Sequence, residues 1–109
     1  MTATNKKRIV QGEDTVIRVL LKDGEGRAFD LTGQTALEAF FVGTAGQFST
    51  TSVAVVGSDD CGVVDITLSE TDTLGLEPGI QPVELQIDKG TARTLVQMAD
   101  SIDVRERLT

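Results

Sequence analysis

Few residues in this sequence could carry chemistry, and the densest group of them lies at positions 69–72. Ser69, Glu70 and Asp72 bring together one hydroxyl and two carboxylates, a combination that hydrolysis or calcium binding can use. Ser69 followed by Asp72 also has the spacing of a capping box, in which each side chain binds a free backbone N–H at the start of a helix. Gly75 and Gly79 come next and suit a chain reversal better than catalysis. We therefore interpret the segment as a capped helical turn that ends at Gly75, between two strands.

The remaining reactive candidates are one cysteine and several aspartates. Cys61 has no histidine anywhere in the chain to activate its thiol, so we interpret it as a turn residue and not as a nucleophile. The lack of histidine, together with a single cysteine, also argues against a zinc site. None of the aspartates follows the DxDxDG spacing of a calcium loop, and neither phosphate-binding motif, GxxxxGKS/T or GxGxxG, occurs. We expect no catalytic residue, no cofactor and no metal ion.

The charge balance restricts the partners. Acidic residues number 17 and basic residues 10, and the resulting formal net charge of −7 repels nucleic acid. No apolar stretch reaches the roughly 20 residues of a membrane span, and the start of the chain lacks the apolar region of a signal peptide. We expect neither a nucleic-acid nor a membrane partner, and assembly in the cytoplasm. Basic residues gather near the two ends, where five of them are candidate partner contacts: Lys6, Lys7, Arg8, Arg105 and Arg107.

Apolar and polar residues alternate along most of the chain, which is the period-two pattern of β-strands. The expected strands are residues 8–11, 15–21, 36–42, 52–56, 63–68, 82–88, 94–98 and 101–104. Turns rich in glycine and aspartate separate several of them, and residues 43–51 are typical of a polar loop or a weak edge region. Seven or eight short strands at this spacing predict an all-β fold, an antiparallel sandwich or barrel with one short helical turn.

The core of such a fold must be aliphatic, because the chain has no Trp or Tyr and only four Phe. Alternation in residues 63–68 and 82–88 directs six side chains inward: Val64, Ile66, Leu68, Val83, Leu85 and Ile87. We expect Leu74 to tuck the helical turn under the sheets.

Phe40 and Phe41 cannot both point inward from one strand, so an exposed ring there would mark an interface. Alternatively, Phe40 faces the core and Phe41 lies under residues 43–51. Phe41 and Phe48 are further candidate partner contacts.

Two stretches of the chain carry the turn and core residues of a known family. They are QGEDTVIRVLLKDGEGRAFDLTGQTALEAFF and GVVDITLSETDTLGLEPGIQPVELQI, with matches at Gly12, Thr15, Asp23, Gly24, Asp30, Leu31, Thr32, Gly33, Gly62, Ile66, Leu68, Thr73, Leu74 and Gly79. On these residues the chain resembles small bacteriophage tail and baseplate domains, in particular the N-terminal immunoglobulin-like domain of baseplate upper proteins. The resemblance covers residues 12–104. It implies an immunoglobulin-like β-sandwich in a virion protein that bridges other structural proteins, and it brings no catalytic residues.

Together these observations predict one domain over residues 1–109 and a non-enzymatic structural role in a bacteriophage virion. The place in the virion stays open between tail, baseplate, fibre attachment and capsid decoration. The partners are other virion proteins, in a homo-oligomer or a symmetric assembly. Residues 1–10 and 105–109 are expected to form short arms that contact those partners. The alternative is a bacterial carbohydrate-binding or adhesion module, which would expose an aromatic ring on a sheet face or loop; a small hydrolase has the least support.

Overall fold

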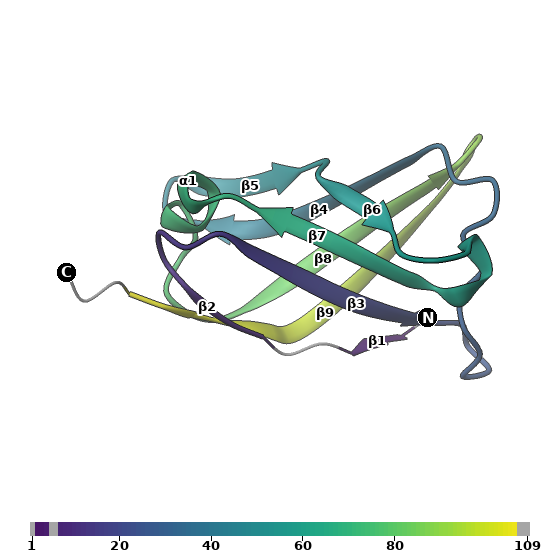
Figure 1. The fold of residues 1–109 in the computed structure, drawn as a ribbon, viewed down its shortest axis with the longest axis horizontal. Helices are drawn as coiled ribbons and strands as arrows, with labels where there is room; N and C mark the ends of the chain where they lie inside the picture. Colours follow the sequence, from purple (N-terminus) through teal and green to yellow (C-terminus); the bar gives the residue numbers. More distant parts are fainter. Residues whose placement is uncertain (1, 5–6, 107–109) are drawn as a thin grey trace.

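The structure, a computed structural model, describes residues 2–4 and 7–106. Within them it contains nine strands, one 3-10 turn and one short α-helix. In chain order these are β1 (Thr2–Thr4), β2 (Lys7–Val10), β3 (Thr15–Lys22), β4 (Ala36–Gly43), β5 (Gly46–Thr50), β6 (Val53–Val55), η1 (Asp59–Cys61), β7 (Val63–Leu68), α1 (Glu70–Leu74), β8 (Gly79–Lys89) and β9 (Ala92–Arg105). Figure 1 shows the strands stacked as two layers, with α1 at one end.

The two layers are a four-stranded sheet in the order β1-β3-β7-β6 and a five-stranded sheet in the order β2-β9-β8-β4-β5. Neighbouring strands are antiparallel except for β2 and β9, which run parallel. Sequence neighbours β3 and β4 lie in different sheets, as do β5 and β6, so the chain passes between the layers at their ends. This is an all-β immunoglobulin-like sandwich, and the predicted fold class is confirmed.

The core between the sheets follows the predicted alternation. Val64, Ile66 and Leu68 on β7 are fully buried, and so are the inward residues of β8, among them Leu85 and Ile87. Because successive side chains of a strand point to opposite faces, one apolar position in every two is enough to fill the interior. The core of the described residues is accordingly aliphatic, with one aromatic ring fully buried in it, that of Phe41.

The N-terminal segment is part of the sandwich, so the prediction of an arm over residues 1–10 is wrong for the strands within it. β1 pairs with β3, and β2 pairs with β9. Ile9 is 1% exposed, because the alternation of β2 turns this side chain into the core. At the other end, β9 is a single strand that runs to Arg105, where two shorter strands were predicted.

Residues 46–50, expected within a polar loop or weak edge region, form the edge strand β5. The turn Thr44–Ala45 is flanked by Gly43 and Gly46, and Gly46 has a φ of 115°, which other residues adopt only with strain. A two-residue connection of this kind returns the chain directly alongside β4. The glycines, which suggested a loop, therefore close a hairpin.

The capped turn is present as α1. Ser69 accepts a hydrogen bond from the N–H of Asp72, Asp72 accepts one from the N–H of Ser69, and Gly75 is the C-cap, as predicted. Leu74 does not pack under the sheets: it is 52% exposed, whereas Thr73 and Leu76 are fully buried. The cap sets the rotation of the helix, and that rotation points position 73 inward and position 74 outward.

Candidate functional site

The hydroxyl and carboxylates around α1 are engaged with backbone groups. The Asp72 N–H donates to Ser69 Oγ at 3.2 Å, and the Ser69 N–H donates to Asp72 Oδ2 at 3.0 Å. The Glu70 N–H donates to Asp14 Oδ1 at 2.8 Å. These bonds satisfy the first N–H groups of the helix. The Ser69 hydroxyl and the Asp72 carboxylate therefore serve to start α1, and Glu70 takes part through its backbone N–H.

The buried Thr73 hydroxyl joins α1 to the loop between β2 and β3. It accepts a hydrogen bond from the Gly12 N–H at 2.9 Å, and it lies 2.9 Å from the Glu13 carbonyl oxygen and 3.1 Å from that of Glu70, to which it can donate. This contact lies at the end of the sandwich near the β4–β5 hairpin, where the Thr44 N–H donates to the Gly75 carbonyl at 2.9 Å. The end of the core is thus closed by hydrogen-bonded backbone.

Cys61 is exposed in the 3-10 turn η1, and its Sγ lies 3.2 Å from Ser58 Oγ. The Ser58 hydroxyl is also 2.7 Å from Asp60 Oδ1. The three side chains form a local hydrogen-bonded turn, in agreement with the interpretation of Cys61 as a turn residue. Across the described residues, no three His, Cys, Asp or Glu side chains are grouped so that they could hold a metal ion.

The basic residues proposed as partner contacts are only partly within the described chain. Arg8 is exposed, and Arg105 is exposed and paired with Asp103 at 2.9 Å. The parallel register places Arg8 opposite Asp103, at the β2 edge of the five-stranded sheet. Lys6 and Arg107, like the side chain of Lys7, lie outside the described part. The role of these residues in binding stays a prediction.

The two phenylalanines proposed as partner contacts pack against each other. Phe41 is 2% exposed, so it is not available as a surface contact, and its assignment as one is wrong. The Phe48 ring is half-buried on β5, with its centroid 5.9 Å from that of Phe41. In the alternative assignment the inward Phe40 is wrong, whereas Phe41 does contact residues 43–51, through the Phe48 ring. Position 41 shares the face of Leu37 and Ala39, which turns Phe40 outward.

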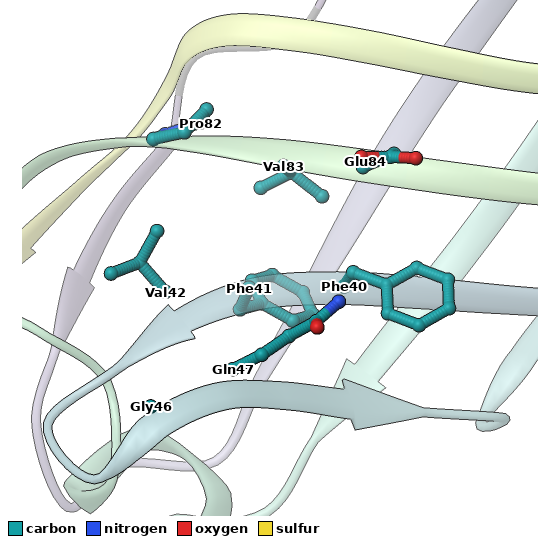
Figure 2. Close-up of a pocket in the computed structure, with 8 residues that line it drawn as sticks. All are labelled: Phe40, Phe41, Val42, Gly46, Gln47, Pro82, Val83 and Glu84. Carbon is teal, nitrogen blue, oxygen red and sulfur yellow. The ribbon is translucent and has the colours of Figure 1, made fainter.

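The outward face of β4 borders a shallow hollow with a volume of about 540 Å³. Figure 2 shows Phe40 and Val42 on β4, with Gln47 on β5 and with Pro82 and Glu84 on β8. Phe40 is half-buried and Val42 is 40% exposed. The hollow is therefore an apolar depression on a sheet face, with one amide and one carboxylate at its border.

Local sequence explains why the sheet is hollowed here. Pro82 falls where the register between β8 and β9 shifts, between Gln81 and Val83, and proline has no N–H to donate to a ladder. Gly46 carries no side chain, and a Cβ added to it would meet nothing within 4 Å. The strand irregularity at Pro82 and the bare backbone of Gly46 thus border the open space beside Phe40 and Val42.

Of the residues that line the hollow, only Phe40 and Phe41 were singled out from the sequence. The sequence pattern that could have found Val42 is the alternation through residues 38–42. Once Phe41 is placed in the core, this alternation directs residues 38, 40 and 42 outward. Gln47, Pro82 and Glu84 join them only through strand pairing, because Val42 lies opposite Gln47 and Phe40 lies opposite Glu84.

The opposite face of the molecule carries a different arrangement. Arg18 on β3 donates from Nε to Asp65 Oδ1 at 2.9 Å and from a terminal nitrogen to Oδ2 at 3.0 Å. This two-point contact from Arg18 holds the pKa of Asp65 below its usual value and raises the pKa of Arg18. The pKa of Asp23 is also lowered, by hydrogen bonds from the backbone N–H groups of Arg27 and Glu25.

No family model and no curated protein matches the sequence. Among solved structures, the chain is similar to part of an endo-β-1,4-mannanase from Thermotoga petrophila, at 12% identity and a TM-score of 0.54 over 97% of this chain. The match spans 20% of the mannanase and shows the fold alone. The Titin M10–obscurin-like 1 Ig complex matches at 8% identity and a TM-score of 0.47, over 100% of this chain and 94% of that one. The Lin-41 filamin domain matches at 21% identity and a TM-score of 0.40, over 90% of this chain and 82% of that one.

In the part of the chain that the structure describes, no helix is long and apolar enough to cross a membrane.

Proposed function

We propose that this domain is a non-enzymatic protein-binding module that serves as a structural component of a bacteriophage virion. The observation that carries the proposal is the apolar hollow at Phe40, Val42 and Pro82 on the outer face of the five-stranded sheet. An exposed apolar patch with polar groups at its border is typical of a surface that contacts another protein. The hollow is therefore the proposed binding site.

Two further observations support this role. The Ser69 hydroxyl and the Asp72 carboxylate are engaged in capping α1, which favours a structural use of these two residues. The resemblance of the turn and core residues to those of phage baseplate domains supports the virion assignment, with other virion proteins as partners and a symmetric assembly as the setting. Assembly would take place in the cytoplasm of the host bacterium.

Carbohydrate binding or adhesion is the second candidate, and one observation favours it. The Phe40 ring lies on an open sheet face with Gln47 and Glu84 nearby, and sugars commonly pack on aromatic rings beside polar side chains. A single half-buried ring offers little stacking surface, so we rank this candidate below protein binding.

Site-specific photo-cross-linking in the cells that produce the protein tests the first candidate. A photoreactive phenylalanine analogue replaces Val42 in one variant and Leu20 in a matched variant, since these two side chains are 40% and 45% exposed on opposite sheets. We expect position 42, and not position 20, to form a covalent adduct with a virion protein that mass spectrometry identifies. Equal labelling from both positions would contradict the assignment of the hollow. If the monomeric protein binds specifically to a glycan array and forms no adduct at position 42, carbohydrate binding replaces protein binding as the proposed function.

A further inference from the structure

β5 is an open edge of the five-stranded sheet, because it pairs with β4 alone. Its sequence, GQFST, contains no charged residue and no proline. The opposite edge, β2, carries Lys7 and Arg8, and the edges of the other sheet, β1 and β6, are three residues long. Proteins usually protect edge strands with charges, prolines or shortness. By these criteria β5 is the least protected edge in the described chain.

The strand pairing shows which backbone groups of β5 are free to bond. The Glu77 N–H donates to the Val42 carbonyl at 3.0 Å, so the polar groups of Val42 point away from β5. Val42 and Gln47 are therefore a non-hydrogen-bonded pair, and Gln47 turns its own N–H and C=O toward the open edge. By alternation Ser49 does the same. Two residues thus offer two donors and two acceptors in the spacing of a strand.

The side chains beside this edge indicate what would suit it. Phe48 points inward from β5 and is only half-buried, so an added strand could cover its ring with an apolar side chain. The next side chains of that strand would lie on the outer face of the sheet. Farther in on this face are Glu38 on β4 and Glu84 on β8, one and two strands from β5, and neither has an ion pair among the described residues. With a formal net charge of −7, the domain attracts basic residues there and repels a second copy of itself.

We propose that β5 takes up an extended, basic segment of another protein as a sixth strand, with apolar residues toward Phe48 and Lys or Arg on the outer face. The added strand would lie next to the hollow, and its backbone would bond Gln47 and Ser49. The proposal rests on the proposed function, since it names the kind of partner segment that the same sheet would bind. It adds a binding mode in which main-chain bonds supply affinity and alternate side chains supply selectivity.

A synthetic peptide is the probe, acetyl-Lys-Val-Lys-Val-Lys-Val-Lys-amide. We expect its addition to the ¹⁵N-labelled protein to shift the amide signals of Gln47 and Ser49 and to slow their hydrogen exchange. A peptide with Glu in place of Lys should bind at least about tenfold more weakly. A peptide N-methylated at alternate amides keeps the side chains but cannot complete a ladder, and it should not slow the exchange of these amides.

Two variants at one position provide the matched control. Ser49→Pro removes the outward N–H without removing a bond to β4, whereas Ser49→Ala keeps it. We expect Ser49→Ala to bind as the wild type does and Ser49→Pro to bind about tenfold more weakly. If Ser49→Pro is unfolded by circular dichroism, the N-methylated peptide makes the same comparison on the wild-type protein.

The proposal is overturned by equal binding of the plain and N-methylated peptides, or by no slowing at Gln47 and Ser49 with peptide up to about 1 mM. Protection of these amides that grows with protein concentration in the absence of peptide would overturn it in favour of a second copy on β5. Cross-linking at position 42 is read independently. A virion adduct there without peptide binding at β5 would leave the proposed function standing and remove only the added strand.

Discussion

The outer faces of the two sheets follow the same alternation and yet differ in character. On the four-stranded sheet, Val16 and Leu20 flank Arg18, which forms a two-point ion pair with Asp65 across to β7. On the five-stranded sheet, Phe40 and its neighbours border an open hollow. Exposure of single apolar residues is similar, 45% for Leu20 and 40% for Val42. The difference lies in the neighbouring strands: opposite charges meet over one face, whereas a proline shift and a bare glycine open the other.

The largest expected effect distinguishes the inner from the outer face of β4. Phe41→Ala should lower the free energy of unfolding by about 3–5 kcal/mol, because it leaves a cavity under Phe48 in the core. Phe40→Ala, the same substitution one residue earlier, should cost less than about 1.5 kcal/mol, because this ring is half-buried beside open space. Urea denaturation of both variants measures the difference. Equal costs would show that the outward ring is also part of the packed interior.

An intermediate effect is expected where α1 holds the end at which the two sheets meet. Thr73→Val keeps the shape of the side chain but leaves the Gly12 N–H without its acceptor, so we expect a loss of about 1–3 kcal/mol. Thr71→Val makes the same change on the exposed side of α1 and should stay within about 0.5 kcal/mol. Thermal unfolding of both variants provides the test. If Thr73→Val leaves the thermal stability unchanged, the outer faces keep their difference without the hydrogen bond between Thr73 and Gly12.

The smallest effect concerns the ion pair that distinguishes the four-stranded face. The folded-state pKa of Asp65 is lowered, chiefly by hydrogen bonding to Arg18, so ionised Asp65 stabilises the folded protein above its unfolded pKa of about 4. That contribution is lost as the pH falls through the lower, folded pKa. Asp65→Asn should therefore make the loss of stability below about pH 4 shallower.

Arg18→Gln is the matched variant for this pH dependence. It removes the partner that lowers the pKa, and it should reproduce the effect of Asp65→Asn, while the double variant should add nothing further. Unfolding midpoints measured from pH 2 to 7 check this. An unchanged pH dependence in both single variants would show that the pair does not contribute.

Much of the architecture could be predicted from local patterns. Alternation placed Ile66, Leu85 and Ile87 correctly in the core, and the spacing of Ser69 and Asp72 correctly predicted a capping box. Where pairing decides the structure, the pattern left alternatives open or missed an element. Residues 43–51 could have been a loop or a weak edge region, and pairing with β4 makes residues 46–50 an edge strand. The strand β1 was not expected and forms by pairing with β3.

The sequence alone determined the strand periodicity, the aliphatic core and the acidic surface, because these depend on the spacing and composition of nearby residues. The tertiary structure decided which of Phe40 and Phe41 faces inward. It also decided that one hollow is surrounded by Val42, Gln47, Pro82 and Glu84. The alternation of a strand still fits the core when its register shifts by two residues. When two neighbouring residues are both apolar, as Phe40 and Phe41 are, either of them can be the one that is buried. Only the pairing of β4 with both β5 and β8 fixes the register and brings residues more than 40 positions apart, such as Phe40 and Glu84, onto one face.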